Sequence, residues 1–224
     1  MNLEFSMFVC MFYDCHTYRF NLSKDIVAII NYKCNDKFED GYTYSVGIHP
    51  WRVAEQNFDM KAFVEIESFS NISNVVAIGE CGLDKIVGNM ELQIEIFKLH
   101  IDLANKLRKP LIVHCVQSFN LVATLLKSVK IPVVIHGINN KIEHLKPLLE
   151  LDCYFSFGKS LLKEKSIAKE TVKYIAENRI LFETDEDDIS IKDVYKQAAL
   201  LKNISFEKIT LQVEQNFKNV FRWE

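Results

Sequence analysis

The stretch VVAIGECGLD, residues 75–84, runs from an apolar segment directly into charged residues. Its first four residues are apolar and suit a strand that is buried on both faces. Glu80 then follows Gly79, Gly82 comes two residues later, and Asp84 ends the stretch. Glu80 thus stands beside glycines at the end of an apolar segment. A carboxylate in such a place needs a polar or charged partner, because apolar side chains cannot replace its hydration. We therefore expect a buried strand that ends in a functional site.

The same pattern, a short apolar run that ends in a polar residue, recurs along the chain. Such runs occupy residues 8–14, 26–32, 42–48, 75–80, 110–115, 132–137, 154–158 and 180–185. Continuous apolar runs of this length are typical of strands in a parallel sheet. Eight strands with helices between them predict a (β/α)₈ TIM barrel of the α/β class. An open, doubly wound sheet is the alternative.

Helical patterns lie between many of these runs. Apolar residues recur every three or four positions in residues 90–108, at Leu92, Ile96, Leu99, Leu103 and Leu107. Further helices are expected at residues 141–150, 166–178, 191–202 and 205–221, the last with Ser205 as its N-cap. The connection between the first two runs is short for a helix, so we expect the barrel to be irregular in its first βα units.

The composition fits one compact domain that spans residues 1–224. The chain is 49% hydrophobic, which is enough for a sizeable core, and it has no linker rich in Ser, Gly or Pro. Its net charge of −3 and isoelectric point of about 6.1 exclude a global basic field for nucleic acid. No apolar run reaches the roughly 18 residues of a membrane span, so no membrane partner is expected.

The cysteines and the N-terminus indicate a cytoplasmic protein. None of the six cysteines forms a C-x-x-C pair, and we expect buried thiols in a reducing compartment. The first residues lack the basic segment and the cleavage site of a signal peptide. Met11 stands shortly before Asp14 in the first run, so residues 1–10 are interpreted as a partly surplus extension.

Six acidic or imidazole side chains stand at or just after the ends of the predicted strands. They are His16, His49, Glu80, His114, His136 and Asp185. In a barrel, the carboxyl ends of the strands meet on one face, and that face carries the chemistry. Imidazole and carboxylate are the ligands of zinc, manganese and magnesium centres, and one Glu can bridge two such ions. The pattern predicts a metal centre around Glu80.

A family resemblance rests on the stretches FYDCHTYR, GIHPW, AIGECGLDK, LIVHC, VIHG and LFETD, which occur in this order. They resemble the TatD family of metal-dependent deoxyribonucleases, and EQNFKNVF near the C-terminus is similar to the closing helix of that family. GECGLDK and HCVQSF look closest to a short variety known from Bacteroidetes. The resemblance implies a TIM barrel of the amidohydrolase-like superfamily with a two-metal centre that cleaves phosphodiester bonds. DNA or another phosphodiester is the implied substrate.

The resemblance also implies roles for particular residues. His16 and Asp185 would bind the first metal ion, His114 and His136 would bind the second, and Glu80 would bridge the two. Asp185 would also orient or deprotonate the attacking water, so Glu80 and Asp185 are the catalytic candidates. His49, Asp84 and Lys85 would lie near the substrate, although a structural salt bridge is an equal alternative for the last two.

Several positions depart from the family pattern. The family opens with His-x-His, whereas here Tyr18 stands in place of the second His, and a phenol with a pKa of about 10 is a poor ligand. The first metal site is therefore expected to be weakened or completed by water. Val116 replaces a common Arg, and GINN follows His136 in place of the usual residues. Glu186, Asp187 and Asp188 place negative charge at the rim, which we expect to repel a phosphate backbone.

Three hypotheses about function follow. The first is an active metal-dependent hydrolase of phosphodiester bonds, a TatD-type deoxyribonuclease with an altered first metal site. The second is a barrel that keeps one metal but has lost turnover and serves as a binding or structural protein. The third is a metal hydrolase of a non-nucleic substrate, because barrels host many chemistries. We expect one or two divalent ions, Zn, Mg or Mn, in a monomeric chain.

Overall fold

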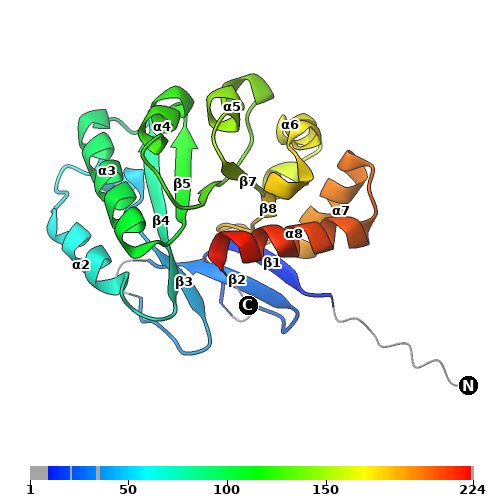
Figure 1. The fold of residues 1–224 in the computed structure, drawn as a ribbon, viewed down its shortest axis with the longest axis horizontal. Helices are drawn as coiled ribbons and strands as arrows, with labels where there is room; N and C mark the ends of the chain where they lie inside the picture. Colours follow the sequence, from blue (N-terminus) through cyan, green and yellow to red (C-terminus); the bar gives the residue numbers. More distant parts are fainter. Residues whose placement is uncertain (1–9, 21, 34–35, 223–224) are drawn as a thin grey trace, which may run out of the picture.

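The computed structural model describes residues 10–20, 22–33 and 36–222, in which eight parallel strands form one sheet in chain order (Figure 1). The strands are β1 (Phe12–Thr17), β2 (Ile26–Asn31), β3 (Thr43–Val46), β4 (Val75–Asp84), β5 (Leu111–Val116), β6 (Val133–Ile135), β7 (Cys153–Phe157) and β8 (Ile180–Phe182). Each lies in one of the predicted runs or overlaps it. The first nine residues, which belong to the predicted N-terminal extension, lie outside the described part.

The backbone of β1 meets the segment after β8 and completes the ring. Thr17 and Asp185 form an isolated parallel bridge, in which Asp185 N donates to His16 O at 3.0 Å and Tyr18 N donates to Asp185 O at 3.2 Å. The buried carboxylate of Asp14 also accepts hydrogen bonds from Thr184, from N at 3.1 Å and from Oγ1 at 2.7 Å. The predicted (β/α)₈ barrel is confirmed, and the alternative of an open doubly wound sheet is wrong.

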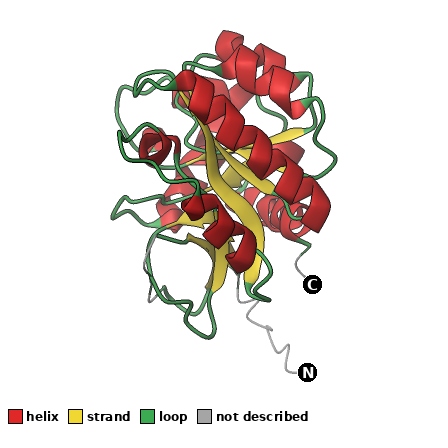
Figure 2. Ribbon diagram, turned by 90° about the vertical axis from the view of Figure 1, so that its left-hand side faces the viewer, coloured by secondary structure: helices red, strands yellow, loops and turns green. Residues whose placement is uncertain are grey.

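Most helices lie outside the sheet (Figure 2). They are α1 (Pro50–Val53), α2 (Lys61–Phe69), α3 (Met90–Leu107), α4 (Phe119–Leu126), α5 (Ile142–Leu149), α6 (Ala168–Tyr174), α7 (Ile191–Lys202) and α8 (Phe206–Phe221), with 3₁₀ turns at Lys159–Leu161 and Glu177–Arg179. Ser205 caps α8 as predicted, because its side chain accepts from Lys208 N at 3.1 Å. No helix lies between β1 and β2, or between β2 and β3, in the described residues, so the irregular first βα units are confirmed.

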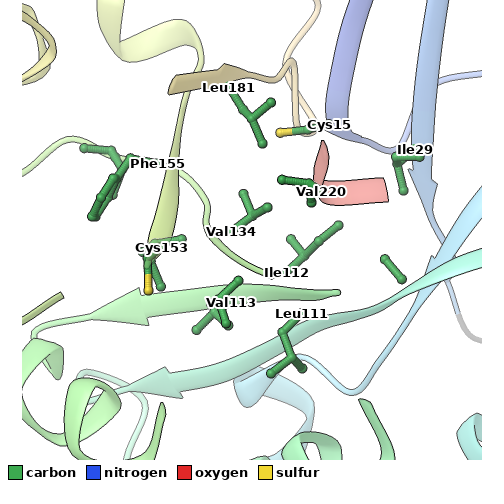
Figure 3. Close-up of a cluster of buried hydrophobic side chains, with 14 of the residues drawn as sticks. Cys15, Ile29, Leu111, Ile112, Val113, Val134, Cys153, Phe155, Leu181 and Val220 are labelled. Atoms are coloured by element: carbon green, nitrogen blue, oxygen red, sulfur yellow. The ribbon is translucent and has the colours of Figure 1, made fainter. Parts of the chain in front are cut away.

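The interior of the barrel is filled by apolar side chains from all eight strands. Figure 3 shows Cys15, Ile29, Ile112, Val134 and Leu181 in one cluster, and each is fully or almost fully buried. Val220 of α8 lies in the same cluster, so the last helix contributes to the core. Four cysteines of the described residues are buried free thiols, as predicted, whereas Cys10 is exposed.

Glycines allow β4 and β5 to approach each other beside the site. Gly79 has φ 141°, and a Cβ there would lie 2.4 Å from Ile112 O. Gly82 has φ 142°, and a Cβ there would lie 2.1 Å from His114 O. The absence of a Cβ at both positions therefore lets backbone carbonyl oxygens of β5 lie close to β4. None of the described helices combines the length and the hydropathy that a membrane span requires.

We predict that Gly82→Ala lowers the free energy of unfolding by about 3 kcal/mol or more, because the new methyl group collides with backbone and the φ is unfavourable. For a domain of this size, the melting temperature falls by roughly 10 °C. Gly88→Ala is the control, because Gly88 also has a positive φ, 83°, but open space around it. Thermal unfolding of both variants checks this, and equal melting temperatures would show that β4 and β5 do not approach this closely.

Candidate metal centre

One oxygen of the Glu80 carboxylate is surrounded by three imidazoles. Glu80 lies in β4 and is 3% exposed. Its Oε1 lies 2.7 Å from His136 Nε2, 3.0 Å from His114 Nδ1 and 3.0 Å from His49 Nε2. His136 follows β6, His114 lies within β5 and His49 lies shortly after β3, so the strands bring together side chains that are far apart in the sequence.

The other oxygen of Glu80, Oε2, lies close to side chains of β1 and of the segment that follows it. Oε2 accepts a hydrogen bond from the Tyr18 hydroxyl at 2.9 Å and lies 3.3 Å from His16 Nε2. The side chain of Asn31 in β2 donates to the Tyr18 hydroxyl at 2.5 Å and lies 3.5 Å from Oε2. Asp185 Oδ1 lies 3.6 Å from His16 Nε2 on the same side. The structure therefore brings all five predicted ligands together, with Tyr18 among them.

The imidazoles keep Glu80 ionised despite its burial. Burial alone would raise the pKa of Glu80, but His136, His114 and His16 lower that pKa well below its usual range. Burial would likewise lower the pKa of His136, but Glu80 and Glu183 raise it well above the ordinary value. The centre therefore combines a carboxylate anion with an imidazole whose protonated form the neighbouring carboxylates favour.

Asp84 holds His114 from behind. Asp84 Oδ2 lies 3.2 Å from His114 Nε2 and accepts from the indole Nε1 of Trp51 at 2.7 Å. Gln93 of α3 fixes the backbone of Asp84, because Asp84 N donates to Gln93 Oε1 at 2.8 Å. A carboxylate on Nε2 places the ring proton there and leaves the lone pair of Nδ1 facing Glu80. Asp84, which was expected near the substrate, is therefore placed where it orients a ligand.

Glu183 has the corresponding place behind His136. It is 2% exposed, its Oε1 lies 3.5 Å from His136 Nδ1, and it accepts hydrogen bonds from Gly137 N at 2.8 Å and from Ser156 Oγ. Burial would raise the pKa of Glu183, but His136 lowers it below the ordinary value. Sequence reasoning missed this residue. The signal was a second carboxylate in LFETD, two positions before Asp185.

His49 presents a proton, not a lone pair, to Glu80. The backbone N of Trp51 donates to His49 Nδ1 at 3.1 Å, so a neutral imidazole carries its proton on Nε2. His100 of α3 anchors the preceding residue, because Ile48 N donates to its Nε2 at 3.1 Å. Burial lowers the pKa of His100 to about 4, so it stays neutral and can accept that bond. The place of His49 at the substrate and not on a metal stays a prediction, since His49 also forms a group of possible ligands with Glu80 and His114.

The buried imidazoles fit a divalent ion. Within the part of the chain that the structure describes, neither ring nitrogen of the fully buried His16 has a hydrogen-bond partner, and His136 Nδ1 also lacks one. Buried polar atoms without partners are costly, and a cation supplies the missing partner. Three groups have ligand atoms within 4.8 Å of one another: His16, Glu80 and His136; His49, Glu80 and His114; and His136, Glu183 and Asp185.

Tyr18 is a neutral phenol in this environment. Burial, followed by the charge of Glu80, raises the pKa of its hydroxyl further above 10. Lys33 Nζ lies 4.3 Å from the centre of the Tyr18 ring on the outer side. The Tyr18 hydroxyl donates a hydrogen bond to Glu80 Oε2, so this carboxylate oxygen already has a hydrogen-bond donor.

The charge at the rim differs from the expectation. Each acidic residue has a basic partner: Glu186 pairs with Lys33 at 2.9 Å, Asp187 with Lys159, and Asp188 with Arg19 at 3.1 Å. These partners reduce the local net charge of the three acids, and the repulsion of a phosphate backbone at this rim stays a prediction. The sequence did not reveal these pairs, since the partners come from three different loops.

A cavity opens at the carboxyl ends of β4, β5 and β6. It has a volume of about 870 Å³. Its lining includes Lys85, which is exposed and follows Asp84, together with polar side chains such as Gln117 and Asn140. Lys85 therefore lines this cavity, whereas none of the five predicted metal ligands is among its described lining residues.

The comparison with protein families finds the description "TatD related DNase" for residues 17–222. An uncharacterized metal-dependent hydrolase from Buchnera aphidicola subsp. Baizongia pistaciae is 33% identical over 196 residues, which cover 79% of this chain and 73% of that protein. A protein from Rahnella named as a 3'-5' ssDNA/RNA exonuclease TatD is 34% identical over 97 residues, 42% of this chain and 36% of that protein.

Solved structures agree on the fold. A TatD homologue from Escherichia coli K12 matches with a TM-score of 0.79 at 17% identity, over 96% of this chain and 100% of that one. A TatD family hydrolase from Entamoeba histolytica matches with a TM-score of 0.75 at 18% identity, over 94% and 98% of the two chains. The family match extends over most of the barrel, and it agrees with the resemblance seen in the sequence. The chain belongs to the TatD family of metal-dependent hydrolases.

Proposed function

We propose that this chain hydrolyses phosphodiester bonds of DNA and holds one divalent ion tightly at Glu80 Oε1. The observation that carries the proposal is that His114 Nδ1 and His136 Nε2 both approach that oxygen while carboxylates stand behind both rings. A carboxylate behind a ligating imidazole is the usual way in which proteins orient a metal ligand. Zn, Mn and Mg remain the candidates, because imidazole favours Zn whereas carboxylate oxygen suits Mn and Mg.

Other side chains have separate roles in the proposed hydrolysis. A bound ion supplies Lewis acidity toward the phosphoryl group and makes a water molecule more acidic. Asp185 is 39% exposed at its side chain, and burial followed by Glu183 raises its pKa above the ordinary value. It is the group that accepts the proton of the attacking water. The Nε2 proton of His49, which faces Glu80 Oε1 at 3.0 Å, would be available to a phosphoryl oxygen when an ion takes its place at Oε1, and Lys85 adds positive charge at the cavity.

Two further observations support a nucleic acid substrate. The cavity of about 870 Å³ at the carboxyl ends of β4, β5 and β6 is large enough for a nucleotide, and its lining includes the cationic side chain of Lys85. Relatives of this chain are named as a deoxyribonuclease and as an exonuclease of ssDNA and RNA. These names describe those proteins, and they favour the same substrate class here.

Protein purified without chelators should contain about one tightly bound divalent ion per chain. His114→Ala should lose this ion, because the variant removes one of two ligating nitrogens at Oε1. His144→Ala, which changes a histidine of α5, should keep it. Elemental analysis after gel filtration measures the ratio. Two equally tight ions in the native protein would contradict this account of the centre.

The reaction itself is tested by hydrolysis of a single-stranded oligodeoxynucleotide with Mn, Mg or Zn supplied in turn. Glu80→Ala and Asp185→Asn should abolish the activity, because one removes the shared ligand and the other the proton acceptor. Asp152→Asn at the amino end of β7 changes a carboxylate far from the centre and should leave the rate unchanged. Protein that binds the ion but cleaves nothing would favour the non-catalytic barrel.

Tyr18→His should restore a second imidazole beside Oε2 and remove the hydroxyl that occupies this oxygen. Residues 16 and 18 alternate onto one face of the chain, so both rings can face the site. A second ion should bind, and the rate should rise by at least about tenfold, since each 1.36 kcal/mol of transition-state stabilisation is a factor of ten.

Tyr18→Phe is the matched control, because it removes the hydroxyl without adding a ligand, and it should gain no second ion. Elemental analysis and the steady-state rate are measured for both variants. A slower Tyr18→His variant would show that the Tyr18 hydroxyl has a catalytic role of its own.

A further inference from the structure

An exposed indole is held rigidly at the edge of the metal centre. The side chain of Trp51 is 60% exposed, although tryptophan is usually buried. Its Nε1 donates to Asp84 Oδ2 at 2.7 Å, and its ring meets the ring of His49 edge-on, with centroids 5.1 Å apart and planes at 85°. One ring edge is thus fixed by two contacts, while most of the ring remains open to solvent.

The carboxylate that holds this indole also belongs to the centre. Asp84 Oδ2 contacts His114 Nε2 at 3.2 Å, and His114 Nδ1 contacts Glu80. Asp84 Oδ1 accepts from the backbone N of Ile86 at 2.9 Å, and the side chain of Ile86 is 68% exposed. One buried carboxylate therefore fixes the ligand His114 and anchors two segments that carry exposed apolar side chains.

We infer that Trp51 is a platform on which an unpaired nucleobase of the substrate stacks. Stacking on an aromatic side chain is the sequence-tolerant way in which proteins bind single-stranded nucleic acid. A base inside a duplex has both faces covered by its neighbours, so the platform selects single strands and frayed ends. The exposed Lys85, which follows Asp84, supplies the positive charge for the adjoining phosphate.

This inference names the substrate class of the proposed hydrolase and rests on that proposal for the reaction, but the binding step is measured without it. Binding of a 5'-fluorescein oligothymidylate is followed by anisotropy at low ionic strength in EDTA, which removes the divalent ions. An oligonucleotide of the same length made of abasic tetrahydrofuran units provides the same phosphates without bases. The two probes separate stacking from phosphate binding.

Three variants accompany the native protein. Trp51→Ala removes the ring, and Trp51→Phe keeps an aromatic face but loses the Nε1 donor to Asp84. Tyr174→Ala is the matched control, because Tyr174 is a 72% exposed aromatic residue at the end of α6, a helix between β7 and β8, whereas Trp51 lies in α1 after β3. Thermal unfolding confirms that each variant is folded.

Trp51→Ala should weaken binding of oligothymidylate by at least about tenfold, whereas Trp51→Phe should stay within about threefold of the native protein. The abasic probe should bind the native protein and Trp51→Ala equally, and Tyr174→Ala should change the binding of neither probe.

The inference is overturned if the native protein does not bind the probe with bases more tightly than the abasic probe. It is also overturned if Trp51→Ala weakens both probes equally or if Trp51→Phe loses as much as Trp51→Ala, because Trp51 would then act through Asp84. Loss of hydrolysis with stacking retained would count against the proposed reaction alone.

Discussion

The centre of this protein depends on one buried carboxylate anion. Glu80 is almost inaccessible to water, and a charge in such a place is tolerated only when partners replace its hydration. Here the partners are four imidazoles and a phenol, delivered by the strands that converge on one end of the barrel. The close approach of β4 and β5, which Gly79 and Gly82 permit, sets the distance between Glu80 and His114.

The two oxygens of Glu80 have different surroundings. Two imidazoles approach Oε1, and a carboxylate stands on the far side of each ring, with Asp84 3.2 Å from His114 Nε2 and Glu183 3.5 Å from His136 Nδ1. Oε2 instead accepts a hydrogen bond from a hydroxyl that replaces the second imidazole of the family pattern. This difference between the two oxygens is the physical basis for proposing one tightly bound ion. His16 and Asp185 lie at Oε2, where we propose the weaker binding of an ion.

Most of the fold could be predicted from the sequence, because buried parallel strands leave continuous apolar runs and long helices leave a clear period. The gathering of His16, His49, Glu80, His114, His136 and Asp185 followed from their places at strand ends. The helices α1, α2 and α4 were not predicted. They are short, and α4 is largely apolar, so its period is hard to distinguish from a buried run.

Contacts between distant loops could not be predicted. The sequence shows three acids in a row after Asp185 but not the basic partners that come from other loops. It shows Asp84 and Glu183 but not that they stand behind imidazoles. Whether a carboxylate faces the substrate or a ligand is decided by distances of a few ångströms, and these emerge only when the barrel closes.

The central claim is that a divalent ion binds tightly at Glu80 Oε1 and weakly or not at all at Oε2. Anomalous diffraction at the manganese edge from crystals soaked in Mn²⁺ tests this most directly. The account predicts one strong peak in contact with Glu80 Oε1, His114 Nδ1 and His136 Nε2, with a weaker peak or none beside His16. A strong peak held by His16 and Asp185, with none at His114, would contradict it.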